Sequence, residues 1–197
     1  YVAKEDYSPN LLNQYARRTV PGFIEVFGAA QPDATVTVMF PSTHGTVHTS
    51  LRQGDLYHLQ LPVDNSHTGR FESLIVSGVA NLVGPAQEDA VTEETRSVFL
   101  PASPEVFVHD LDGNLTADAR WHYAWDAENR LSAIESTPAA LAAGLPSVKL
   151  EFAYDAQSRR ISKKVYNSVA GAWVLASHHL FLYDGWNMIA EVDALNG

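Results

Sequence analysis

The fold is best indicated by the segment Tyr154-Asp155-Ala156-Gln157-Ser158-Arg159-Arg160-Ile161. An aromatic residue followed by aspartate suits the end of a strand, because the carboxylate can accept backbone N–H bonds two or three residues further on. The pattern recurs in three more segments: His109-Asp110-Leu111-Asp112-Gly113-Asn114-Leu115, Trp125-Asp126-Ala127-Glu128-Asn129-Arg130-Leu131 and Tyr183-Asp184-Gly185-Trp186-Asn187-Met188-Ile189. Each segment predicts a β-hairpin in which the later apolar residue re-enters the sheet.

The third residue after each aspartate supports this interpretation. A tight turn needs one residue with positive φ, which Gly and Asn adopt at little cost. Ser158 suits that position least, so we expect strain or a different turn there. The predicted turn residues are therefore Asp110, Gly113, Asp126, Asn129, Asp155, Asp184 and Asn187.

The spacing of the aspartates is consistent with a repeat carrying inserted loops. The intervals are 16 residues (126−110), 29 residues (155−126) and 29 residues (184−155). Together, these segments resemble the tyrosine-aspartate (YD, or Rhs-type) repeats of bacterial proteins. Leu12-Asn13-Gln14-Tyr15 resembles a segment often found between such repeats. The resemblance implies a β-shell of adjoining repeats in a large secreted or cell-surface protein of a bacterium.

The N-terminal half has strand-like alternation of a different kind. Short segments with a period of two and many β-branched residues predict strands, among them Thr35–Phe40, Leu56–Leu61 and Leu74–Ser77. The strand ending at Gly28, the Pro32-Asp33-Ala34 turn and the following Thr-Val-Thr-Val run resemble small bacterial immunoglobulin-like domains. We therefore expect an all-β protein with a small β-sandwich-like domain over residues 13–83, a linker over 84–90 and a repeat sheet over 91–197.

Composition narrows the range of functions. The net charge is −10, from 13 Lys and Arg against 23 Asp and Glu, which disfavours binding to nucleic acid. Absence of cysteine excludes disulfides and thiolate sites. No apolar run is long enough to predict a membrane span, and only residues 138–145 suggest a helical turn. With no initiator Met or signal segment, we expect a piece cut from a longer polypeptide or a mature product.

The main functional interpretation is a structural or binding module without a cofactor. Its expected partners are adjacent repeats, or a second copy that pairs with an exposed strand at the edge of the sheet.

Two alternatives stay open. In the first, His44, His48 and His58 converge on one sheet face and hold a divalent metal such as zinc, as in a metal-dependent hydrolase. In the second, Trp121 and Trp125 share one face of a strand and form a platform for carbohydrate rings. Packing inside the sheet would also explain that aromatic stripe.

Overall fold

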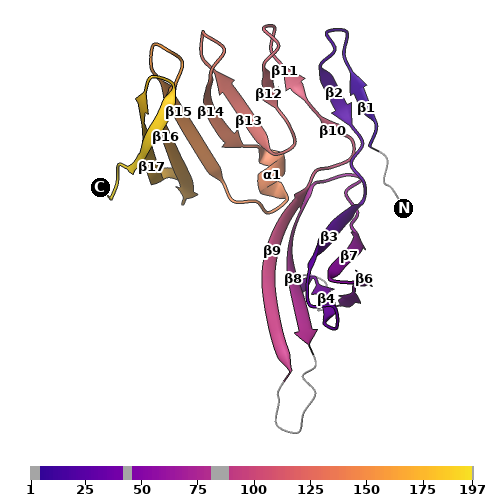
Figure 1. Ribbon diagram of the computed structural model, residues 1–197. Coiled ribbons are helices and arrows are strands. Elements are labelled where there is room, and N and C mark those ends of the chain that lie inside the picture. Colours follow the sequence, from indigo (N-terminus) through magenta and orange to yellow (C-terminus); the bar gives the residue numbers. More distant parts are fainter. Residues whose placement is uncertain (1–4, 42–45, 81–88, 197) are drawn as a thin grey trace. The chain divides into compact units, whose positions relative to one another are not determined.

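The computed structural model describes residues 5–41, 46–80 and 89–196. The chain is almost entirely β, which confirms the predicted fold class (Figure 1). It divides into two compact units. One unit is built on Val20–Ser103, which we call the insert. The other combines Glu5–Thr19 with Pro104–Gly197, which we call the repeat region.

The insert is made of two antiparallel sheets. One sheet has the order β3-β7-β6 and the other has the order β5-β4-β8-β9. Alternate residues of β3 and β4 are buried, as a period of two requires for strands with one face on a core. The strands are β3 (Phe23–Ala29), β4 (Thr35–Met39), β5 (Val47–Thr49), β6 (Leu51–Gln53), β7 (Leu56–Pro62), β8 (Arg70–Ala80) and β9 (Ala90–Leu100).

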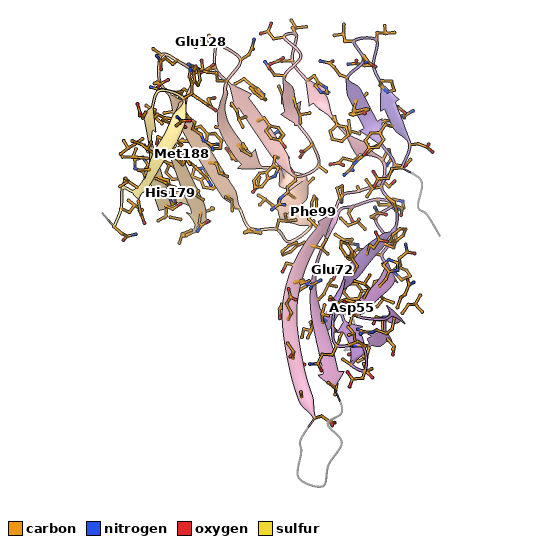
Figure 2. All side chains as sticks on the ribbon, in the orientation of Figure 1. Asp55, Glu72, Phe99, Glu128, His179 and Met188 are labelled. Carbon is orange, nitrogen blue, oxygen red and sulfur yellow. The ribbon has the colours of Figure 1, made fainter. Side chains whose placement is uncertain are left out.

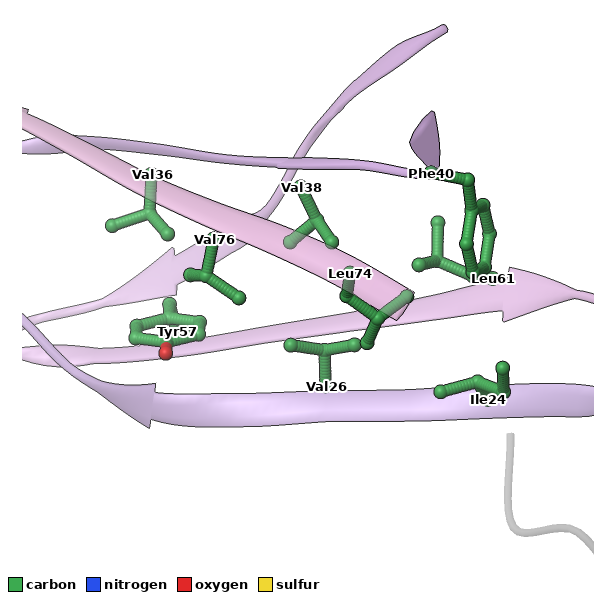
Figure 3. Close-up of a cluster of buried hydrophobic side chains, with 9 residues drawn as sticks. All are labelled: Ile24, Val26, Val36, Val38, Phe40, Tyr57, Leu61, Leu74 and Val76. Atoms are coloured by element: carbon green, nitrogen blue, oxygen red, sulfur yellow. The ribbon is translucent and has the colours of Figure 1, made fainter. Parts of the chain in front are cut away.

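Apolar side chains from both sheets form the core of the insert (Figure 3). Leu61 and Val38 are fully buried, and Tyr57 lies over Gly28, where any Cβ atom would collide with the phenol ring. Burial of apolar area from two facing sheets is the main source of stability in such a sandwich. The cluster comprises Ile24, Val26, Val36, Val38, Phe40, Tyr57, Leu61, Leu74 and Val76.

The boundaries between the two units differ from the predicted ones. Strand β9 pairs with β8 along its full length, from Arg70 opposite Leu100 to Ala80 opposite Ala90, so it belongs to the insert. Most of the linker expected over residues 84–90 lies outside the described residues. Residues 13–19, assigned to the β-domain from sequence, belong to the repeat region. Alternation alone does not reveal which neighbour a strand pairs with, and this explains the error.

Asn65 fastens the two ends of the insert to each other. This buried side chain donates to the carbonyls of Val20 (3.3 Å) and Pro101 (2.8 Å). The backbone carbonyl of Asn65 accepts from the Ser103 N–H, and the Ser103 hydroxyl accepts from the Val20 N–H at 3.1 Å. The chain therefore enters and leaves the insert at neighbouring points.

The repeat region contains a three-stranded sheet, β1-β2-β10, and an eight-stranded sheet running in sequence order from β11 to β18. Its elements are β1 (Tyr7–Pro9), β2 (Tyr15–Arg18), β10 (Glu105–Val106), β11 (Val108–His109), β12 (Leu115–Ala117), β13 (Trp121–Trp125), β14 (Leu131–Ser136), α1 (Pro138–Ala142), β15 (Val148–Tyr154), β16 (Arg160–Val169), β17 (Ala172–Asp184) and β18 (Asn187–Asp193). Thr137 caps α1 by accepting from the Ala140 N–H at 3.0 Å, so the expected helical turn is confirmed.

This region has a much thinner core than the insert. Among the described residues, its buried apolar side chains are Ala140, Leu145 and Phe181, and most strand residues are half-buried. Strand pairing and polar contacts between hairpins must therefore carry much of its stability.

Candidate functional site: the row of hairpin turns

Four hairpin turns in the repeat region have the same backbone geometry. In each, the first residue donates to the carbonyl of the fifth residue, and the fourth residue donates to the carbonyl of the first, at 2.8–3.2 Å. The fourth residue has positive φ: 60° at Asn13, 91° at Gly113, 57° at Asn129 and 60° at Ser158. The turns are Asn10–Gln14, Asp110–Asn114, Asp126–Arg130 and Asp155–Arg159, and their tips lie along one edge in Figure 1.

The first side chain of each turn accepts backbone N–H bonds, as the sequence predicted. Oδ1 of Asp155 accepts from the N–H groups of Gln157 and Arg159 at 2.9 and 3.0 Å. Oδ1 of Asp126 accepts in the same way from Glu128 and Arg130. The carboxylates are thus committed to the turn, while Glu128 at a tip is largely exposed and pairs with the Arg130 guanidinium at 2.8 Å (Figure 2).

The turn that begins at Asn10 was missed in the sequence. Its amide oxygen accepts from Leu12 N–H and Gln14 N–H at 2.9 and 3.0 Å, reproducing the aspartate pattern. Pro9 stands where the other turns have an aromatic residue or His, and Asn10 stands where they have aspartate. Neither residue of the recurring pair is therefore present. The spacing Asn10-x-x-Asn13 was the signal that could have revealed it.

Strain or a different turn was expected at Ser158, and the structure shows strain: Ser158 keeps the turn of its counterparts with a φ of 60°. The prediction for Asn187 is wrong. In the last hairpin, Gly185 has the positive φ instead of Asn187, and Asp184 pairs directly with Asn187 across a tighter two-residue turn. Gly at the first central position removes the need for a longer turn.

The hairpins of the four turns, and the last hairpin with its two-residue turn, each carry a β-bulge beside the turn. The pairing skips one residue of the returning strand, which is Ser132 between Leu131 and Ala133. The hydroxyl of Ser132 donates to the Ala124 carbonyl, and that of Thr116 to the Val108 carbonyl, each at 3.1 Å. Because the bulge recurs at corresponding positions, it is a feature of the repeat and not a local defect.

The fifth residue of each turn links it to the next turn. Arg130 donates from Nε to Asp126 at 2.8 Å and from Nη1 to the Asp155 carbonyl at 3.3 Å. Arg159 binds Asp155 in the same manner and donates to the Gly185 carbonyl. Two amides complete the series: Gln14 donates to the Gly113 carbonyl and Asn114 donates to Asn129. We call this continuous series of contacts the turn ladder.

Aromatic residues before the aspartates form a second set of links. Tyr154 Oη donates to the Leu131 carbonyl at 2.9 Å, and Tyr183 Oη donates to the Arg160 carbonyl at 3.0 Å. Trp125 Nε1 donates to the Leu115 carbonyl at 2.8 Å. In each case the acceptor is the residue just after the preceding turn, so every aromatic side chain fixes its hairpin against the one before it.

The guanidinium groups of the ladder also contact these rings. Arg130 lies 5.2 Å from the Tyr154 ring centroid, and Arg159 lies 5.1 Å from that of Tyr183. A planar guanidinium can stack on a ring while it donates in its own plane, which an ammonium group cannot do.

Electrostatics stabilise the ionised form of the turn carboxylates. The pKa of Asp126 lies below its ordinary value, mainly because the carboxylate accepts the Arg130 backbone N–H, with a further contribution from the Arg130 side chain. These groups are bonded donors and acceptors in a structural network. None of them is an unoccupied acid or base poised for catalysis.

His48 and His58, two of the three histidines proposed as zinc ligands, are not brought together. His48 lies on β5 and His58 lies on β7, in different sheets of the insert, and His44 lies outside the described residues. His58 instead contacts Glu25 at 2.8 Å. Within residues 5–41, 46–80 and 89–196, no three His, Asp or Glu side chains are grouped to hold a metal ion.

The tryptophans proposed as a sugar platform lie on the same side of β13. Trp121, Tyr123 and Trp125 are half-buried, whereas His122 and Ala124 between them are exposed. Trp121 contacts the Arg120 guanidinium, and Trp125 is bonded to Leu115 as described above. Trp125 is thereby bonded within the sheet, Trp121 lies against the turn that precedes β13, and the carbohydrate platform stays a prediction.

Comparison of the chain with protein-family models, curated proteins and solved structures found no match. Among the described residues, no helix has the length and apolar character to cross a membrane.

Proposed function

We propose that this chain is a structural and binding module of a YD (Rhs-type) repeat protein of the bacterial surface or of a secreted product, in which the repeat region is a segment of β-wall. The observation that carries this proposal is the turn ladder, in which each hairpin donates to the next. Such nearest-neighbour contacts are how repeat proteins build extended surfaces from short units.

In this proposal the insert is a separate domain that the β-wall carries. It has its own core, and Asn65 holds its two ends close together. The insert can therefore interrupt the repeat in sequence without separating the strands before and after it. In the repeat region, strands β2 and β10 flank the insert in sequence and pair with Arg18 opposite Glu105. Arg18 Nε also donates to the buried Glu105 carboxylate at 2.6 Å. The wall would supply rigidity, and the insert would supply a distinct surface for contact.

Duplication of one repeat tests the wall proposal. A second copy of residues 155–183 placed after Tyr183 supplies one complete turn, strands β16 and β17, and the aromatic residue that the next unit needs. If the region is a ladder of equivalent units, the longer chain folds with one more hairpin. Circular dichroism and a cooperative thermal transition at or above the original Tm would report this.

The matched control is an insertion of equal length in which the copied Asp155, Arg159 and Tyr183 are replaced by alanine. This copy retains strand residues and lacks the ladder contacts, so its Tm should be lower. If the intact duplication unfolds the chain, or if the two insertions behave alike, the ladder does not organise the region and the proposal fails.

A further inference from the structure

A cleft of about 430 Å³ opens at one end of the insert. Both sheets contribute to its lining, with Pro62 at the end of β7 from one sheet and His48 of β5 and Arg70 of β8 from the other. Buried Phe40 forms part of an apolar floor. An apolar floor with a few polar groups at its rim is the usual form of a small-molecule site.

Arg70 places a guanidinium group with unused hydrogen-bond donors at this rim. Its Nε donates to the Asp64 carbonyl at 2.9 Å, which holds the side chain beside the cleft. Within the described part of the chain, its two terminal nitrogens donate to no other group. A guanidinium with both terminal nitrogens available is suited to a carboxylate, which it can bind through two parallel hydrogen bonds.

Asp64 presents the opposite charge at the same rim. Its Oδ1 accepts from the backbone N–H and the hydroxyl of Ser66, at 3.0 and 2.6 Å. These bonds fix the carboxylate while its other oxygen accepts from no described residue. Glu72 adds a second carboxylate to the lining. An ammonium group is the complement of such a carboxylate rim.

We propose that this cleft binds a free, zwitterionic α-amino acid with a large apolar side chain, such as leucine or phenylalanine. The ligand carboxylate is held by Arg70, its ammonium group by Asp64, and its hydrocarbon lies against Phe40 and Pro62. The site lies wholly within the insert, so it stands or falls independently of the repeat proposal.

The test is a titration of the ¹⁵N-labelled full chain with L-leucine or L-phenylalanine up to about 10 mM, followed by NMR. Saturable shifts in residues around the cleft are expected. Leucinamide lacks the carboxylate and N-acetyl-leucine lacks the ammonium group. Each should bind at least about tenfold more weakly than leucine, since each loses a charge-assisted contact.

Two variants separate the site from general effects of charge. R70Q and D64N should each weaken leucine binding at least about tenfold, and D64N retains an oxygen that can accept the Ser66 bonds. R96Q is the matched control, because Arg96 pairs with Glu94 at a different place on the insert and should leave binding unchanged.

Absence of saturable shifts in the wild-type chain would overturn the proposal. So would undiminished binding by R70Q, or equal binding of N-acetyl-leucine, which would indicate recognition of a carboxylate alone, as at a peptide C-terminus.

Discussion

Ser158 occupies a backbone conformation that serine adopts only at a cost. Its φ of 60° matches that of Asn129 at the same point of the preceding turn. Asn tolerates this region better than serine does, and glycine tolerates it best. The S158G variant is therefore expected to raise the free energy of unfolding by about 0.5–1 kcal/mol, as measured by urea denaturation.

Gln157, the residue before Ser158, provides the control. Its φ is not positive, so the Q157G change only adds flexibility and should lower stability. Equal effects of the two glycine substitutions would contradict a specific conformational demand at residue 158.

The aspartate turns should respond to acid, and the asparagine turn should not. The pKa values of Asp126 and Asp155 are lowered in the folded chain. Their contribution is therefore fully present above the unfolded pKa of about 3.9 and is lost as pH falls through the lower, folded value. Asn10 holds its turn with an amide oxygen that does not titrate in this range.

Amide hydrogen exchange between about pH 5 and pH 2 can follow this difference. After correction for intrinsic exchange, protection of the Arg130 and Arg159 N–H groups should fall in acid, whereas the Gln14 N–H should retain its protection. Parallel loss of protection at all three amides would show that the carboxylates are not the cause.

Individual turn residues could be predicted because their chemistry is local. Gly113 and Asn129 have the expected positive φ, and Asp110, Asp126 and Asp155 accept the expected bonds. The Arg130 and Arg159 links could not be inferred, because each joins positions more than twenty residues apart whose alignment depends on the pairing register.

At the level of the hairpin, the contacts of Arg159 in the turn ladder require a guanidinium group. Lysine keeps the positive charge but cannot bind Asp155 through two nitrogens while stacking on Tyr183 and donating to Gly185. R159K should lower the free energy of unfolding by about 1 kcal/mol. Thermal denaturation would measure the loss.

Arg17 is the matched control for that change. It is exposed and lies on a strand of the same region, so R17K should have no measurable effect. If R159K is as stable as R17K, the guanidinium contacts between turns add nothing beyond charge.

Elements were easier to predict than their partners. The predicted strands over Thr35–Phe40 and Leu56–Leu61 are present as β4 and β7, because alternation reports which residues face a core. The assignment of β9 failed because its residues, such as Glu93 and Thr95, are mostly exposed and polar and give no sign of the partner strand.

Over the whole chain, the repeat region is one series of hairpins that is not contiguous in sequence. A repeat of five bulged hairpins is interrupted after the first by the insert, and the chain resumes its pairing at Glu105 opposite Arg18. The sequence could not reveal this interruption, because the Asn10 turn lacks the aspartate of the other turns. Its hairpin was therefore not recognised as the first of the series.

The most direct test of a continuous repeat interrupted by an inserted domain is removal of the insert. Residues 20–103 are replaced by Asn-Gly between Thr19 and Pro104, which favours a tight turn where Arg18 and Glu105 already pair. The two-dimensional ¹H–¹⁵N NMR spectrum of the shortened chain is then compared with that of the full chain. Most resonances of residues 5–19 and 104–196 are expected to keep their positions, including the Gln14 and Asn114 side-chain amides of the ladder. Collapse of that spectrum, or loss of the β1–β2 hairpin signals, would contradict a continuous repeat interrupted by an inserted domain.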